Sequence, residues 1–364
     1  MQLGIMINFG TDVRDRVDEV VAMEGVGLDI VHLAEGYSYD AVSALGFLAA
    51  RTSTLRLATG ILQIYTRTPT LTAMTAAGLD NLSRGRFVLG VGASGPQVIE
   101  GFHGVPFDAP VARTRELIDI CRKVWRRERL VHDGRHYHIP LSAEQGTGVG
   151  KALKLVHTPD RASIPVVVAA LGRRNVEMTA EVADGWMPTM FDPSRYQTVW
   201  GKSLAAGSAK RDASLWDLKI TVSPPLAIGP DADAYLPQVK AHLAFYIGGM
   251  GSRKQNFYHD VATAYGYGDD AERIQELFLS GRQEQAIAAV PDEFAYSTSW
   301  IGDAGTVARR VEAFAAAGDK SIRTALSLDD THRSARTGSL RSASAVFRAC
   351  SVGRRSLVHR SIAT

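Results

Sequence analysis

Two side chains in the first third of the chain are of types that move protons, and each follows a segment that would position it. Glu35 comes directly after the apolar run 28–33, which reads as a strand, so its carboxylate is our first candidate for a general acid or base. A structural salt bridge at this position is an equally good interpretation. His103 lies in a loop between Gly101 and Gly104, and its usual pKa suits proton transfer near neutral pH. A plain surface histidine is the simpler alternative.

A third candidate, Glu100, follows a run of small residues. The strand expected over residues 86–89 ends in a loop made of Gly90, Gly92, Ala93, Ser94 and Gly95. Pro96 then opens a predicted helix, whose unpaired N–H groups favour a phosphate or a ring carbonyl. Glu100 falls in the first turn of that helix, where a carboxylate is explained more simply by the helix dipole.

The glycines of this loop also match the dinucleotide-binding pattern G-x-G-x-x-G, and we reject that interpretation. The pattern requires an acidic residue at the end of a strand about 20 residues later. Residues 113–125 occupy that place, and their apolar spacing predicts a helix. Only the general inference remains, namely a ligand at a strand–loop–helix junction.

A second junction of this kind predicts an anion site. A strand expected over 164–170 is followed by a loop of Gly172, Arg173, Arg174 and Asn175, and a helix is predicted over 176–183. Two guanidinium groups at a helix N-terminus favour an anion through charge-assisted hydrogen bonds and the helix dipole. Two solvated arginines beside a turn glycine are the alternative.

The elements that must position these groups alternate along the chain. Strands are expected over 3–8, 28–33, 55–63, 85–92, 164–170, 186–188, 218–228 and 322–328, with helices between them. Such alternation favours parallel strands with helical crossovers. Eight units predict a TIM-like (β/α)₈ barrel, whose active site lies at the C-terminal ends of its strands, and a doubly wound open sheet is the alternative.

Composition is ordinary for a globular protein, and the net charge of +3 has a local origin. Residues 331–364 contain seven Arg and no Asp, Glu or Lys, so residues 1–330 carry a net charge of −4. We therefore expect no nucleic-acid partner. Two cysteines, with no leader-like or membrane-spanning segment, favour a cytoplasmic protein.

We expect one barrel domain over residues 1–328, with a largely helical insertion at about 231–290. Residues 329–364 are expected to form a disordered Ser/Arg-rich tail, either from an altered reading frame or as a basic segment with its own partner. His132, His136 and His138 surround a predicted hairpin turn at Asp133–Gly134. No Cys or carboxylate accompanies them in the sequence, so we expect an exposed hairpin and no metal.

Several long segments resemble the luciferase-like monooxygenase superfamily, and specifically its branch that uses the deazaflavin coenzyme F420. They include LATGILQIYTRTPTLTAMTAAGLDNLSRGRFVLGVGASG, IPVVVAALGRRNVEMTAEVADGWMP and GGMGSRKQNFYHDVA, and the resemblance covers most of residues 1–320. It implies a TIM-like barrel with the coenzyme ring near the exits of the third and fourth strands.

The resemblance also implies individual roles. The step Gly60–Ile61 would be a non-prolyl cis peptide behind the ring, and residues 92–95 would lie beside it. Gly172 to Asn175 would hold the coenzyme phosphate, and Thr66 would touch the ring edge or the anionic tail. Arg253 and Lys254 are candidates for contact with a polyglutamate tail.

The implied activity is hydride transfer between F420 and a small organic substrate, with a possible homodimer as the assembly. One alternative keeps the fold but binds FMN and activates O₂ as a monooxygenase. A second alternative is a non-catalytic flavin- or deazaflavin-binding protein. The sequence does not identify the substrate.

Overall fold

The computed structural model describes residues 2–7, 13–251, 256–317 and 322–327. These residues fall into two compact units, each built from separate stretches of the chain. The first unit draws on the described residues of the ranges 1–29, 188–202 and 219–364, and the second on 30–187 and 203–218. Helix α7 (Tyr196–Ser208) contributes residues to both units.

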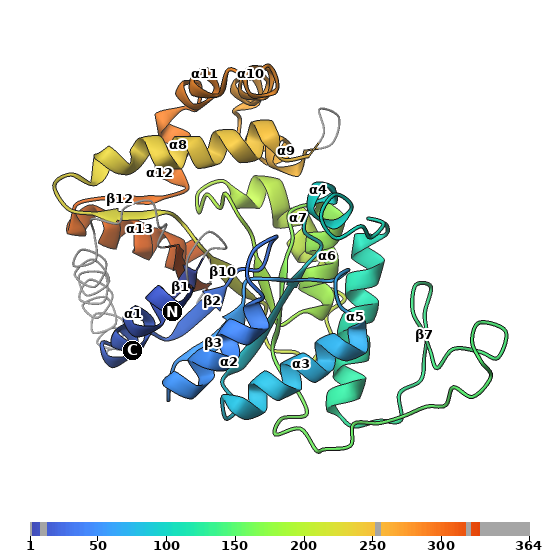
Figure 1. Ribbon diagram of the computed structural model, residues 1–364. Coiled ribbons are helices and arrows are strands. Elements are labelled where there is room, and N and C mark those ends of the chain that lie inside the picture. Colours follow the sequence, from blue (N-terminus) through green and yellow to red (C-terminus); the bar gives the residue numbers. More distant parts are fainter. Residues whose placement is uncertain (1, 8–12, 252–255, 318–321, 328–364) are drawn as a thin grey trace. The chain divides into compact units, whose positions relative to one another are not determined.

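The second unit contains a parallel sheet flanked by helices (Figure 1). Its strands pair in the order β2–β3–β5–β8–β9, and β4 pairs with the end of β5. Their bounds are β2 Ile30–Leu33, β3 Arg56–Thr59, β4 Leu62–Gln63, β5 Phe87–Gly92, β8 Val166–Ala169 and β9 Gly185–Met187. Nearly every residue of these strands is buried, as expected for a parallel sheet covered by helices.

Four longer helices of the second unit pack against one another in chain order. They are α2 (Ala41–Arg51), α3 (Pro69–Leu82), α5 (Pro110–Trp125) and α6 (Arg173–Val182). Local signals mark the starts of three of them: the Asp40 carboxylate caps α2, the Thr68 hydroxyl caps α3 before Pro69, and Pro110 opens α5. The one-turn helix α4 (Pro96–Ile99) and the hairpin β6–β7 (His132–Asp133 with His138–Ile139) complete this unit.

The first unit has a parallel set in which β13 (Ile322–Ser327) lies between β1 (Leu3–Ile7) and β10 (Lys219–Val222). A separate parallel pair joins β11 (Leu226–Ile228) to β12 (Trp300–Gly302). Its helical segments are α1 Val13–Gly25, η1 Ala232–Tyr235, α8 Leu236–Ala244, η2 Phe245–Gly249, α9 Phe257–Ala264, α10 Gly268–Leu279, α11 Gln283–Ala288, α12 Asp292–Ser297 and α13 Ala304–Ala317.

A strand overlaps each of the eight predicted strand ranges, and the described residues of 231–290 are largely helical as expected. Three predictions need correction. The range 218–228 contains two strands in different sheets, because Pro224 and Pro225 interrupt it. Strand β5 ends at Gly92, as the range 85–92 predicts, so Gly90 and Gly92 belong to the strand and not to the loop expected after Leu89; helix α6 begins at Arg173 instead of at residue 176. Segments α7, α12 and β12 were not predicted.

Candidate active site at the strand exits of the second unit

The predicted cis peptide bond at Gly60–Ile61 is confirmed. It separates β3 from β4, which explains why the strand expected over 55–63 is divided in two. The Gly60 N–H donates to the Leu33 carbonyl (2.7 Å), and the Ile64 N–H donates to the Gly92 carbonyl (3.0 Å). These two bonds bring the exits of β2, β4 and β5 together around the cis step.

Glycine is required at position 90 by close backbone packing. A Cβ added to Gly90 would lie 1.9 Å from the Thr59 carbonyl oxygen, next to the cis step. Thr59 Oγ1 donates to the Gly90 carbonyl (2.7 Å) and accepts from the Gly90 N–H (2.8 Å). A Cβ at Gly92 would meet the Ile61 side chain at 3.2 Å. The absence of a side chain at these two glycines therefore leaves room for Thr59 and Ile61 to pack closely against β5. The sequence pattern alone did not reveal this role.

The loop after β5 differs from its sequence-based interpretation. Ala93, Ser94 and Gly95 follow the strand, with Ser94 in the left-handed region (φ 59°) and Gly95 at the N-cap of α4. Because α4 has only four residues, it lacks the aligned dipoles of a full helix. The expected dipole-based site at this N-terminus is therefore not supported. What remains is a small-residue loop at the end of β5.

Glu35 is held in an ion pair. Its carboxylate accepts two hydrogen bonds from Arg67 (2.6 and 3.1 Å) and one from the Ala41 N–H (3.0 Å). Arg67 also donates to Asp40 at 2.7 Å. This is the salt-bridge arrangement weighed above, and it leaves the proton-transfer role of Glu35 a proposal.

The electrostatics of this cluster favour its charged forms. Burial alone would lower the pKa of the Arg67 guanidinium, but its hydrogen bonds to Glu35 and the charges of Glu35 and Asp40 outweigh this, so that pKa lies above its usual value. Burial also disfavours the charged form of Asp40, and would by itself raise the pKa of that carboxyl. Hydrogen bonds from Ser43 and the charge of Arg67 overcome that effect and bring the pKa below its usual value.

His103, unlike Glu35, has a ring nitrogen without a hydrogen-bonding partner in the described part of the chain. Its Nε2 is buried and has no hydrogen-bonding partner among the described residues. The ring lies edge-on to Phe102, with centroids 5.1 Å apart. Backbone N–H groups of Phe102 and His103 both donate to the Val98 carbonyl (3.0 and 3.2 Å), which fixes this segment after α4. An unpaired buried nitrogen is costly in a folded chain unless a ligand or water completes it.

Glu100 does not lie in the first turn of a helix as predicted. It is exposed at the C-terminal end of α4, and its Oε1 accepts from the Phe107 N–H at 3.2 Å. The dipole explanation of this carboxylate is therefore wrong, because the helix is a single turn and Glu100 caps its other end.

Gln63 was not among the site residues predicted from the sequence. This side chain ends β4, three residues after Gly60, and only 1% of its surface is exposed. Its Nε2 donates to the Gly36 carbonyl (3.3 Å), and its Oε1 has no partner among the described residues. A polar residue that ends a buried strand beside the cis step was the available signal. Thr66 nearby donates to the Gln63 carbonyl at 3.3 Å.

The second junction follows β8, the strand next to β5. Gly172 is the N-cap of α6, and Arg173, Arg174 and Asn175 form the first turn of this helix instead of the preceding loop. Both arginines are exposed, while Asn175 Oδ1 is buried and unpaired among the described residues. The ten-residue helix has its N-terminal N–H groups directed at this end. The anion site at this end of α6 stays a prediction.

The histidine hairpin forms, but one expectation about it is wrong. His132 is only 9% exposed, with Nε2 3.2 Å from Glu116 and Nδ1 3.1 Å from Asp119, both on α5. The sequence could not show these carboxylates, because they lie 13 or more residues away. Burial raises the pKa of Glu116, but hydrogen bonds from His132 and from hairpin N–H groups lower it below its usual value. No group of three or more potential metal ligands occurs among the described residues.

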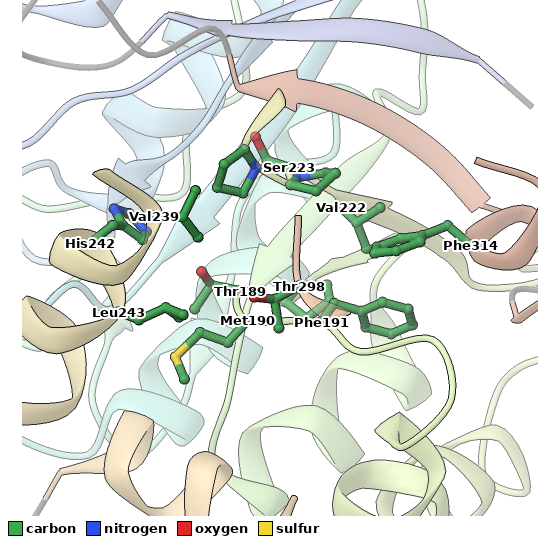
Figure 2. A pocket seen from close by; sticks show the side chains of 13 residues that line it. Thr189, Met190, Phe191, Val222, Ser223, Val239, His242, Leu243, Thr298 and Phe314 are labelled. Atoms are coloured by element: carbon green, nitrogen blue, oxygen red, sulfur yellow. The ribbon is translucent and has the colours of Figure 1, made fainter. Parts of the chain in front are cut away.

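A separate small cavity lies in the first unit. Figure 2 shows Thr189, Met190, Ser223 and His242 among the side chains around it. Its volume is about 30 Å³, which is enough for a water molecule and too small for an organic substrate. Ser223 Oγ is buried there without a partner among the described residues, as expected of a group that binds an ordered water.

Two expectations fall outside the described residues, namely Arg253 with Lys254 and the tail 329–364. Within the part of the chain that the structure describes, no helix has the length and apolar character needed to cross a membrane.

Parallel strands with helices between them, as in the second unit, are typical of α/β barrels. The chain belongs to the luciferase-like monooxygenase family, whose model matches residues 1–321. A Mycobacterium tuberculosis relative, provisionally named a coenzyme F420-dependent oxidoreductase, is 40% identical over 323 residues, covering 87% of this chain and 93% of the relative.

Solved structures agree on the fold. The F420-dependent tetrahydromethanopterin reductase of Methanopyrus kandleri matches with a TM-score of 0.77 and 20% identity, covering 95% of this chain and 97% of that one. An FMN-containing type II Baeyer–Villiger monooxygenase component of Pseudomonas putida matches with a TM-score of 0.63 and 16% identity, covering 95% and 96%. The predicted TIM-like fold is thus confirmed, and the open-sheet alternative is set aside.

Proposed function

We propose that the protein is a coenzyme F420-dependent oxidoreductase that transfers a hydride between the deazaflavin and a small organic substrate. The observation that carries this proposal is the 40% identity, over 87% of the chain, to a relative that is provisionally named an F420-dependent oxidoreductase.

The residues at two strand exits fit such a coenzyme. Gly60, Ile61, Thr66 and the loop 92–95 would line its ring, with the unpaired Gln63 Oε1 available to an N–H or O–H group. Arg173 and Arg174 at the start of α6, with Gly172, would hold its phosphate. Asn175 Oδ1, which is buried and has no partner among the described residues, would accept a hydrogen bond from a hydroxyl group on the side chain of the coenzyme.

When bound, the deazaflavin supplies a two-electron hydride donor or acceptor. We assign the accompanying proton to His103, because its buried Nε2 is the unpaired one of the three candidate groups. It would donate to the substrate oxygen as the adjacent carbon is reduced, and accept the proton in the reverse direction. Glu35 would act mainly by holding Arg67, and Glu100 by holding the chain at Phe107.

Two alternatives stay open to experiment. An FMN-dependent monooxygenase would share the fold, as the Pseudomonas putida structure does. A non-catalytic binding protein would bind the coenzyme without substrate-dependent turnover.

Equilibrium binding of F420 and of FMN, followed by fluorescence at moderate salt, tests the proposal. We expect F420 to bind more tightly, and Asn175→Ala to weaken F420 binding by roughly tenfold through loss of one hydrogen bond. Thermal melting of this variant should be little changed, since the removed Oδ1 has no partner among the described residues. Tighter binding of FMN would support the monooxygenase, and binding of neither would overturn both assignments.

We also infer a cytoplasmic homodimer. Exposed apolar side chains on α2 and α3, namely Phe47, Leu71 and Met74, support self-association. Light scattering of the purified protein would contradict the dimer by returning the monomer mass across the micromolar range.

A further inference from the structure

Two exposed aromatic rings lie together beside the candidate active site. Tyr37 follows β2 and is 57% exposed, and Phe102 follows α4 and is 65% exposed. Their ring centroids are 6.1 Å apart at an interplanar angle of 52°. We call this pair the aromatic shelf. Both residues belong to the second unit, which also contains the candidate active site.

The position of the shelf is set by the backbone on both sides. Phe102 and His103 share the Val98 carbonyl as acceptor, and a Cβ at Gly101 would lie 2.4 Å from the Gln97 carbonyl oxygen. On the other side, Gly36 directly precedes Tyr37, and its carbonyl accepts from Gln63. The backbone next to each ring is therefore held by hydrogen bonds or close packing, which lowers the entropic cost of ordering these segments on binding.

Polar groups of the site adjoin the shelf. The His103 ring lies edge-on to Phe102 at 5.1 Å, and its Nε2 is buried and unpaired among the described residues. Tyr37 follows Glu35 by two residues. A substrate whose oxygen forms a hydrogen bond with His103 Nε2 would therefore have its neighbouring groups near the shelf.

The shelf is too small for a protein partner. A specific protein interface buries about 800 Å² on each side, whereas two side chains offer a fraction of that. Its neighbours in the chain, Ser38, Asp40 and Glu100, are exposed and polar. A small planar group suits it better, because aromatic faces and edges pair favourably with flat apolar rings.

We propose that the aromatic shelf binds the planar apolar part of the substrate and that His103 bonds the substrate oxygen. The substrate class is then a ketone, or the corresponding secondary alcohol, that carries an aromatic or similarly flat group next to the oxidised carbon. This inference rests on the proposed hydride transfer, in which C=O gains a hydride from the reduced deazaflavin at carbon and a proton from His103 at oxygen.

The test uses two matched probes, acetophenone and cyclohexyl methyl ketone, which share the carbonyl and the carbon count but differ in planarity. Their binding to the F420-saturated full-length protein is measured by saturation-transfer NMR. We expect acetophenone to bind more tightly, and Phe102→Ala and Tyr37→Ala each to weaken acetophenone binding by roughly three- to tenfold. Cyclohexyl methyl ketone should be affected less.

Tyr39→Ala is the matched control, because Tyr39 is 63% exposed in the same loop and lies outside the pair. It should leave both probes unchanged. Equal affinity for acetophenone in the wild-type protein and the two shelf variants, with F420 binding retained, would overturn the shelf alone. Loss of the planar preference in Tyr39→Ala as well would have the same consequence. Failure of the wild-type protein to bind F420 would instead overturn the proposed function, and the shelf inference with it.

Discussion

Two regions of the second unit carry candidate proton-transfer groups, and the structure treats them in opposite ways. At the exit of β2, the Glu35 carboxylate accepts from Arg67 and from the Ala41 N–H, so its oxygens are committed to neighbours. After α4, the His103 Nε2 is buried and has no partner among the described residues. Both residue types move protons in enzymes.

The difference shows that the role of a side chain depends more on whether its polar atoms already have hydrogen-bonding partners than on its chemical type. A carboxylate that already accepts three hydrogen bonds stabilises the local fold, and proton transfer would require it to release them. An unpaired buried nitrogen is a cost to folding, which binding of a substrate oxygen would remove. The same contrast separates the exposed Arg173 at the start of α6 from the paired Arg67.

The largest expected effect is that of His103→Ala on turnover. If His103 supplies the proton, its removal should lower kcat by about 100-fold or more, because general acid–base groups contribute at least that much. The melting temperature and the affinity for F420 should change little, since Nε2 has no partner to lose among the described residues. Stopped-flow measurement of F420 reduction or oxidation gives the rate, and a loss below threefold would contradict the assignment.

Glu35→Gln should show the reverse pattern. The ion pair with Arg67 is well sheltered, with side-chain exposures of 9% for Glu35 and 16% for Arg67. We expect a loss of about 1–2 kcal/mol in unfolding free energy, measured by urea denaturation, because a neutral amide forms a weaker pair. Turnover should fall by less than tenfold. A fall comparable to that of His103→Ala, with stability unchanged, would restore Glu35 as the general acid.

The smallest expected effect concerns acid pH. The pKa of Asp40 is lowered in the folded protein, chiefly by Ser43 and then by Arg67, which together outweigh burial. This carboxylate therefore adds stability above its ordinary pKa of 3.8, and that contribution is lost as the pH falls through the lower folded value. Asp40→Asn should flatten the decline in urea midpoint as the pH falls from about 5 to below 3.8. A decline as steep as in the wild-type protein would show that other groups dominate.

Local patterns were enough to predict much of the fold. The alternation of apolar strands with helices indicated parallel strands, and Pro96 correctly marked the first residue of α4. Errors had two sources. Pro224 and Pro225 divide the range 218–228, which is a local signal that the prediction did not use, whereas the short α4 depends on packing partners that no local window contains.

The candidate site follows the same division. The sequence by itself determined which polar residues stand at the strand exits, because strand and loop types are encoded locally. Only the tertiary structure decided that Glu35 is paired by Arg67, 32 residues away, that Gln63 Oε1 and His103 Nε2 are left unpaired, and that Gly90 is needed against Thr59. The physical reason is that hydrogen-bond satisfaction and close packing depend on neighbours in space, which sequence order does not specify.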